Sequence, residues 1–366
     1  MHDKLCSYQI IIFIGDFRFG GAEVVGVNLA NAFVAHGFHV RLIVLRKDGA
    51  LLPRLNEKVE IISLESKIIT SLPKLIKQLI ALNYKPSILI SSIRNLNILV
   101  GISKILLRLS NTKVIMREAN TYRQLWTGGC SDQIKGLAYK VIIPPIYGFA
   151  DFVIANSCDT KTDLEEMGVE KKQRNISVIG NPVVTNDLDA KSSKESRSKH
   201  DLHILSVGRL HKQKNYGLAF NALELLSKDY RIKFVIVGTG NLYETINNRA
   251  KRATFDVEIL QPREDISNFF QDVDVFLLCS LWEGFGNVVV ESMAHGVTPV
   301  VVDCPGGPKD IVGRKYGYIA QQTPESVAEK IKVAKMNPIP KSLLKSRSNL
   351  YSADNISLDY IRLIKE

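Results

Sequence analysis

Short apolar runs that alternate with helical patterns constrain the fold of this 366-residue chain more than any other feature. Each run is of the kind that fills a buried parallel strand. The runs lie at residues 8–14, 40–45, 59–62, 88–91, 114–116, 204–207, 234–237 and 275–278. Helical patterns occupy the segments between them, for example around 73–82 and 99–109. This alternation predicts an α/β protein with parallel sheets that helices cover on both faces.

The length of the chain favours two domains. We expect the first domain to span residues 1–185 and the second to span residues 201–340. The tract at 191–199 is rich in Ser, Lys and Arg, so residues 186–200 are predicted to be a solvated linker. In the tail, 341–366, a helical stripe is formed by Ile356, Tyr360, Ile361 and Leu363.

The composition, with 45% apolar and 23% charged residues, is ordinary for a soluble enzyme. No apolar run approaches the roughly 18 to 20 residues that span a bilayer, and no signal-peptide pattern precedes Ile10. The five cysteines are scattered without metal-ligand spacing, so no zinc site is predicted. Cys279 ends an apolar run and is interpreted as a small core residue. We therefore expect a cytoplasmic protein.

The net charge of +11 belongs mainly to the first half of the chain. Residues 67–140 include 12 basic side chains and only two acidic ones, Glu118 and Asp132. Such an excess suits anionic lipid, a pyrophosphate-linked acceptor or nucleic acid, or it is merely a solvated face. No nucleic-acid-binding module accompanies it, so no nucleic acid partner is expected. The amphipathic helix at 74–80 is predicted to pack on the sheet rather than on a membrane.

The stretch 281–296 carries the strongest candidate site. It follows the apolar run 275–278 and leads into a helical pattern that stops at Gly296. Gly284 and Gly286 allow a sharp turn that leaves amides uncovered at a helix start, where an anion is stabilised. Glu283 on the loop and Glu291 in the helix flank this turn and can bind hydroxyl groups. A phosphate site between two carboxylates suggests a nucleotide-sugar ligand.

A glycine-rich corner between strand and helix is common in α/β proteins, and a Glu near a helix start is usually solvated. The full string is more specific. Glu283-Gly284-Phe285-Gly286-Asn287, with Glu291 eight positions after the first Glu, resembles the Glu-x7-Glu signature of the retaining GT-B glycosyltransferases of family 4.

Other segments resemble the same family. Gly20-Gly21-Ala22-Glu23 is similar to its N-terminal loop, which faces the donor diphosphate, and the spacing does not fit a dinucleotide fingerprint. Gly208-Arg209, followed by Lys214, resembles the family's diphosphate clamp. Gly238 lies in a turn similar to its nucleotide-facing loop. The turn at 303–311 resembles one that approaches the Glu283 loop closely.

The resemblance implies two Rossmann-like domains that face each other across a cleft, with the last helix, in 341–366, crossing back to the first domain. It implies transfer of a hexosyl or N-acetylhexosaminyl group from a nucleotide-sugar, with UDP favoured over GDP, and no metal. Arg209, Lys214 and Glu283 are the expected catalytic residues. The expected substrate-binding residues are Gly20, Gly21, Glu118, Asn120, Gly208, Gly238, Gly284, Phe285, Gly286, Asn287, Val288 and Glu291. Asp272 and Asp274 precede their strand and are interpreted as structural.

The expected acceptor is a hydroxyl of a glycan or a polyprenyl-pyrophosphate-linked sugar in surface polysaccharide synthesis. The basic first domain suits peripheral contact with the inner face of an anionic membrane. Three alternatives remain open. A non-hydrolysing sugar-nucleotide epimerase shares the architecture, an oxidoreductase would bind NAD, and a silent subunit would bind the nucleotide-sugar without catalysis.

Overall fold

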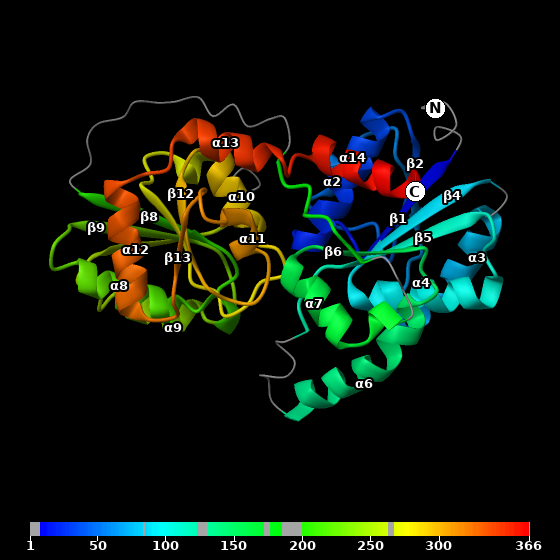
Figure 1. Cartoon of the computed structure of the whole chain (residues 1–366), viewed down its shortest axis with the longest axis horizontal. Coiled ribbons are helices and arrows are strands. Elements are labelled where there is room, and N and C mark those ends of the chain that lie inside the picture. Colours follow the sequence, from blue (N-terminus) through cyan, green and yellow to red (C-terminus); the bar gives the residue numbers. More distant parts are fainter. Residues whose placement is uncertain are drawn as a thin grey trace. The chain divides into compact units, whose positions relative to one another are not determined.

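The computed structural model describes residues 8–82, 85–122, 130–171, 176–184, 200–262 and 267–365. The chain forms two compact units. Unit 1 comprises Met1–Val183 together with Ala353–Glu366, and unit 2 comprises Val184–Ser352. Each unit is built on its own sheet, covered by helices (Figure 1).

Unit 1 contains a seven-stranded sheet in the order β3-β2-β1-β4-β5-β6-β7, with every pair parallel. Its strands are β1 (Gln9–Ile14), β2 (His39–Val44), β3 (Glu60–Ser63), β4 (Ser87–Ser92), β5 (Thr112–Glu118), β6 (Phe152–Ala155) and β7 (Ile176–Val178). Every residue of β1 and of β4 is buried. Continuous burial follows from helices on both faces, and it explains why these strands are unbroken apolar runs.

Six α-helices of unit 1 lie within the described residues. They are α2 (Gly21–Ala35), α3 (Leu72–Leu82), α4 (Arg94–Leu107), α6 (Cys130–Tyr147), α7 (Cys158–Glu166) and α14 (Ala353–Lys365). Helix α3 buries Leu75, Leu79 and Leu82 in the core, so its apolar face packs on the unit as predicted. Helix α14 packs on α2, where the rings of Tyr360 and Phe33 meet edge to face with centroids 6.2 Å apart. The predicted stripe in the tail is buried throughout.

Unit 2 contains a six-stranded parallel sheet in the order β10-β9-β8-β11-β12-β13. Its strands are β8 (Leu202–Val207), β9 (Ile232–Val237), β10 (Asp256–Leu260), β11 (Val275–Leu278), β12 (Thr298–Val302) and β13 (Tyr318–Ala320). Its helices are α8 (Tyr216–Leu226), α9 (Tyr243–Ala250), α10 (Asn287–Ala294), α11 (Pro308–Val312), α12 (Pro324–Met336) and α13 (Lys341–Asn349). Helix α13 packs against α10, so the segment that returns to unit 1 is α14 alone.

Both sheets reverse their winding direction at one place. In unit 1 the chain builds outward from β1 on one side and from β4 on the other, and in unit 2 it does so from β8 and β11. The loops that follow two such strands diverge to opposite faces of the sheet. In open parallel sheets, ligands bind beside the carboxyl ends of these strands. The two switch points are therefore the places to look for a site.

Candidate functional site

The loop after β8 and the loop after β9 approach each other through two glycines. The amide of Gly208 donates to the carbonyl oxygen of Val237 at 2.9 Å. A Cβ atom at Gly238 would lie 1.9 Å from the carbonyl oxygen of Gly208, and one at Gly208 would lie 2.6 Å from Cε of Lys214. Gly208 also has φ +157°, at the edge of the region that favours glycine. Because neither glycine has a side chain, the backbones of the two loops and the side chain of Lys214 pack closely together beside the switch point.

Lys214 and Glu283 form an ion pair across the switch point of unit 2. Lys214 lies on the loop after β8 and Glu283 on the loop after β11, and Nζ is 2.7 Å from Oε1. The side chains are only 12% and 9% exposed. The hydroxyl of Ser280 donates to the same carboxylate oxygen at 2.5 Å. A buried carboxylate is thus held by one cation and one hydroxyl, which satisfies its charge and fixes its orientation.

Gln213 joins these two loops and was missed by the sequence analysis. The side-chain amide of Gln213 donates to the backbone carbonyl oxygen of Trp282 at 2.8 Å. The backbone carbonyl oxygen of Gln213 accepts from the backbone amide of Leu281 at 2.8 Å. The exposed guanidinium of Arg209 donates to Oε1 of Gln213 at 3.3 Å. Gln213 therefore brings Arg209 and Lys214 to the same edge of the sheet as Glu283. In the sequence, Gln213 is marked only by its position between two basic residues, at 212 and 214.

The start of α10 is a glycine turn. Gly286 is the N-cap residue with φ +93°, a left-handed conformation that favours glycine, and no side chain caps the helix. Asn287, Val288 and Glu291 lie half-buried in its first turns. Gly284 and Phe285 are buried, and the ring of Phe285 meets that of Tyr351 edge to face at 5.3 Å.

The turn after β12 supports this loop from the other side. The amide of Glu283 donates to the carbonyl oxygen of Pro305 at 2.9 Å, and the amide of Gly307 donates to that of Gly284 at 3.1 Å. A Cβ atom at Gly306 would lie 2.0 Å from the carbonyl oxygen of Glu283. The predicted close approach of the turn at 303–311 is therefore confirmed.

Two sequence interpretations in unit 2 are confirmed as structural roles. Cys279 is buried, and burial raises the pKa of its thiol, so it is a core residue rather than a nucleophile. The carboxylate of Asp274 accepts from the amide of His203 at 2.9 Å and pairs with Lys335 at 2.8 Å. Among the described residues, no group of three or more His, Cys, Asp and Glu side chains is arranged to hold a metal ion.

The structure places the remaining predicted residues in unit 1, at two separate positions. Gly20 caps the start of α2 and Gly21 is its first residue. A Cβ atom at Gly20 would lie 2.1 Å from Oε2 of Glu23, so the glycine makes room for that carboxylate. Burial raises the pKa of Glu23, because the charged form loses hydration.

Glu118 lies at the end of β5, but it is fully buried and has internal partners rather than an open approach for a substrate. The hydroxyls of Tyr122 and Tyr147 donate to its Oε2 at 2.7 and 2.8 Å. Arg94 lies 3.8 Å from Oε1, with its guanidinium stacked on the ring of Tyr122. Burial raises the pKa of both phenols. This cluster ties α4 and α6 to the sheet. Of the two residues predicted here to bind substrate, Glu118 is buried and Asn120 is exposed.

Breaking the ion pair should destabilise unit 2. Lys214→Met leaves the Glu283 carboxylate buried with no cation, which is expected to cost about 3–5 kcal/mol of the free energy of unfolding. In the double variant Lys214→Met/Glu283→Gln the loss should be smaller than the sum of the two single losses. Urea denaturation of the two single variants and of the double variant measures the three losses in the free energy of unfolding.

Lys233→Met, which removes a half-exposed partner of Glu258, is the matched control and should stay within about 0.5 kcal/mol of the wild type. Additive losses in the double variant would show that the two side chains do not interact.

Comparison with known proteins is consistent with this geometry. The family model described as Glycosyltransferase Family 4 matches residues 19–187, and the model described as Glycosyl transferases group 1 matches residues 188–352. A relative from Campylobacter jejuni, N-acetylgalactosamine-N,N'-diacetylbacillosaminyl-diphospho-undecaprenol 4-alpha-N-acetylgalactosaminyltransferase, is 25% identical over 264 residues, which is 70% of each chain.

Solved structures share the fold over almost the whole chain. Sucrose-phosphate synthase from Thermosynechococcus elongatus has a TM-score of 0.79 at 18% identity, with 98% of each chain covered. Anabaena HepE in complex with UDP and glucose has a TM-score of 0.77 at 16% identity, with 98% of this chain and 99% of that chain covered. Together with the two family models, these likenesses show that the chain belongs to the group 1, family 4 glycosyltransferases and consists of two Rossmann-like domains of the GT-B type.

Proposed function

We propose that this glycosyltransferase moves a hexosyl or N-acetylhexosaminyl group from a UDP-sugar to a hydroxyl of a glycan or lipid-linked acceptor, with retention of the anomeric configuration. The observation that carries the proposal is the Lys214–Glu283 pair beside the glycine turn of α10. It sets a cation and a carboxylate at the switch point where a nucleotide-sugar would lie. The bound UDP and glucose in HepE support a UDP-linked donor.

The leaving UDP gains negative charge as the glycosidic bond breaks. Arg209 and Lys214, with the amides of 286–288, would neutralise this charge through preorganised electrostatics and without a metal. The glycines at 208, 238, 284 and 286 would let backbone approach the diphosphate, with Phe285 and Asn287 holding that turn. Glu291 would bind the ribose hydroxyls, and Glu283 would bind a hydroxyl of the donor sugar.

In unit 1, Gly20 and Gly21 would face the diphosphate, and Asn120 would face the acceptor. The acceptor hydroxyl would attack from the face that the diphosphate leaves, with the leaving phosphate taking its proton. The Campylobacter jejuni relative, whose name states a diphospho-undecaprenol acceptor, supports a polyprenyl-pyrophosphate-linked acceptor in surface polysaccharide synthesis.

Nucleotide selectivity tests the donor site. UDP at about 100 times its Kd should add about 2.7 kcal/mol to the apparent stability of the folded chain, because it binds only the folded state. Glu291→Ala should lose most of that gain, whereas Glu325→Ala, an exposed carboxylate at the start of α12, should keep it. A thermal-shift panel of UDP, GDP, ADP and NAD, with and without EDTA, measures this. Stabilisation by NAD alone, or by no nucleotide, would refute the donor site.

Product stereochemistry tests the mode of transfer. The glycosidic bond of the product should have the same anomeric configuration as the donor, because attack and departure share one face of the sugar. Proton NMR of the product, through the coupling constant of its anomeric proton, measures this. An inverted anomer would rule the mechanism out.

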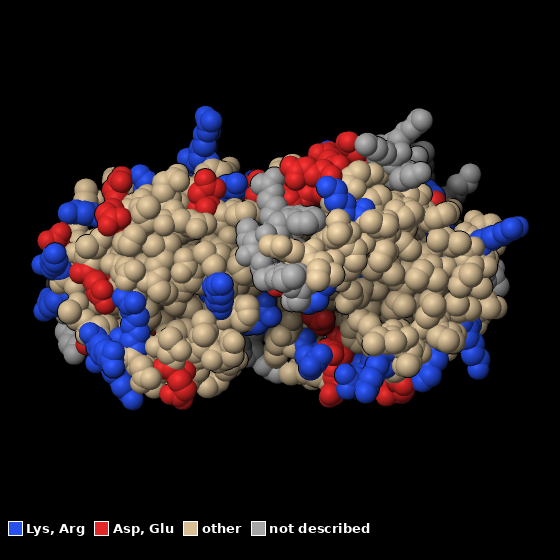
Figure 2. All heavy atoms as spheres, turned by 90° about the horizontal axis from the view of Figure 1, so that it is seen from below, with Lys and Arg blue, Asp and Glu red and all other residues tan. Residues whose placement is uncertain are grey.

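We also propose that unit 1 contacts an anionic membrane at its cytoplasmic face through α6. Ile134, Leu137 and Val141 recur at helical spacing and are 63%, 62% and 70% exposed. Lys135 and Lys140 are exposed on the same helix. Helix α6 is the lowest helix of unit 1 in Figure 1, and Figure 2 shows the molecule from that side. Within the described ranges, no helix is long and apolar enough to cross a membrane.

Vesicle binding tests this contact. The protein should sediment with vesicles that contain phosphatidylglycerol and less with pure phosphatidylcholine, and salt should weaken the binding. Ile134→Ser/Leu137→Ser/Val141→Ser should weaken it about tenfold or more, since three apolar side chains no longer enter the interface. Met336→Ser/Leu350→Ser removes exposed apolar side chains from unit 2 and should change nothing. Equal binding by both variants would contradict the role of α6.

A further inference from the structure

Tyr351 lies at the point where the chain leaves unit 2. This unit begins at Val184 and ends at Ser352, and these two residues form an isolated parallel β-bridge. The amide of Val184 donates to the carbonyl oxygen of Tyr351 at 3.2 Å. The amide of Tyr351 donates to the carbonyl oxygen of Ser348, in α13, at 2.9 Å. The backbone of Tyr351 is therefore held both by the first residue of unit 2 and by its last helix.

The side chain of Tyr351 reaches the glycine turn at the start of α10. Its ring meets the ring of Phe285 edge to face, with centroids 5.3 Å apart and an angle of 71° between the planes. Phe285 is only 4% exposed. A ring that is buried this deeply acts on a ligand through the backbone that carries it, which here is the backbone between Gly284 and Gly286. Tyr351 is thus the aromatic partner of a residue within the candidate site.

Arg347 lies over the ring of Tyr351 and joins it to α11. Its guanidinium carbon is 5.3 Å from the centroid of the Tyr351 ring and 5.0 Å from that of Tyr316, which suits cation–π contacts. Nη2 and Nε of Arg347 donate to the carbonyl oxygens of Asp310 at 2.6 Å and Ile311 at 3.0 Å, both in α11. The position of the Tyr351 ring is therefore fixed by a cation that is itself held by a helix.

The start of α11 supports the same glycine turn. A Cβ atom at Gly307 would lie 2.5 Å from the carbonyl oxygen of Phe285, and one at Gly286 would lie 3.2 Å from Cγ of Pro308. Phe285 is consequently held twice, with its ring on Tyr351 and its backbone on α11. These two contacts fix the amides that follow at 286–288.

We propose that Tyr351 is a positioning residue for the loop at 283–288, the donor loop. Through the ring of Phe285 it fixes the backbone whose amides, in the proposed function, stabilise the leaving diphosphate. The inference rests on that function and names a residue outside the loop on which the geometry of the loop depends. Preorganised hydrogen-bond donors act only while they are held in place, and a displacement of about 1 Å costs about a hundredfold in rate.

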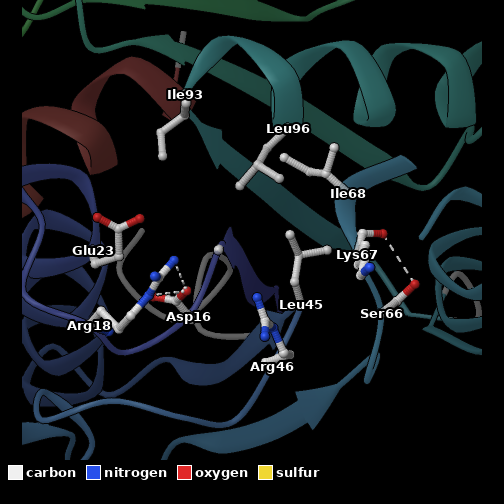
Figure 3. Close-up of a pocket in the computed structure, with 11 residues that line it drawn as sticks. Asp16, Arg18, Glu23, Leu45, Arg46, Ser66, Lys67, Ile68, Ile93 and Leu96 are labelled. Atoms are coloured by element: carbon white, nitrogen blue, oxygen red, sulfur yellow. Dashed lines mark hydrogen bonds and ion pairs between the residues drawn. The ribbon is translucent and has the colours of Figure 1, made fainter. Parts of the chain in front are cut away.

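The loop after β1 in unit 1 provides an internal control. It lies at the switch point of its own unit, beside a cavity of about 300 Å³ (Figure 3). Residues that follow β1, β2, β3 and β4 line this cavity, among them Asp16, Arg46, Lys67 and Ile93. Asp16 is held within the loop by Arg18, whose Nη2 is 2.7 Å from Oδ2. Because Tyr351 belongs to the other unit, its loss should not affect amide exchange at 15–18.

Amide hydrogen exchange of the whole chain without ligand tests the positioning role. In Tyr351→Ala, exchange at 283–289 and 306–309 should be about tenfold faster than in the wild type, because the aromatic pair that holds this turn is lost. Tyr351→Phe keeps the ring and should exchange at the wild-type rate. Tyr230→Ala removes a half-buried tyrosine just before β9, at the opposite edge of the sheet, and should leave both segments unchanged.

UDP affinity separates positioning from stability. Titration calorimetry well below the unfolding temperature of each variant should show UDP binding about tenfold weaker in Tyr351→Ala and unchanged in Tyr351→Phe. A merely structural role would lower the Tm and leave the Kd of the folded chain as it is. In a Phe285→Leu background, Tyr351→Ala should have a smaller effect, because the ring through which it acts is absent.

Exchange in Tyr351→Ala that equals the wild-type rate, or a rise that extends to 15–18, overturns the proposal. An equal loss in Tyr351→Phe, or an undiminished effect in the Phe285→Leu background, also overturns it. If the wild type binds no UDP, the proposed donor site fails, and the exchange rates decide whether Tyr351 fixes this loop. Circular dichroism shows whether each variant is folded, and Tyr351→Leu replaces Tyr351→Ala if the alanine variant is not.

Discussion

Parallel pairing of every strand is the constraint on which the rest of the structure depends. A parallel pair needs a long crossover, so a helix returns over the sheet after each strand and all carboxyl ends open at one edge. Where the winding reverses, two neighbouring loops diverge and leave room beside the sheet. In unit 2 the Lys214–Glu283 pair lies there, and in unit 1 the cavity with Arg46 and Lys67 lies there. One topological rule thus explains where both lie.

Eight of the thirteen described strands could be predicted from the sequence, because strands buried on both faces are continuous apolar runs. The run at 275–278 coincides with β11, and the others differ from their strands by a few residues. The helix expected around 99–109 begins earlier, at Arg94. Its start was missed because Ile93, in a left-handed conformation and with no side-chain cap, carries none of the usual signals of a helix N-terminus.

The part of the candidate site that lies on one short segment could be predicted from the sequence, as the glycine turn at 283–287 shows. What the sequence could not show are partners far apart along the chain. Lys214 and Glu283 are 69 positions apart, and the tyrosine that shares Glu118 with Tyr122 is 29 positions from it. Glu118 was predicted from its place at a strand end, and that rule cannot tell a carboxylate open to solvent from one enclosed by α4 and α6. The cavity in unit 1 is likewise assembled from four separate loops.

The return of α14 to unit 1 has a consequence for the order in which the chain can fold. Residues 184–352 form unit 2 as one uninterrupted segment, whereas unit 1 is split around it. During synthesis, all of unit 2 is made before α14, the helix whose Tyr360 packs on Phe33 of α2. The half that begins the chain is therefore the last to be completed, and until then its uncovered apolar face is open to aggregation or to a chaperone.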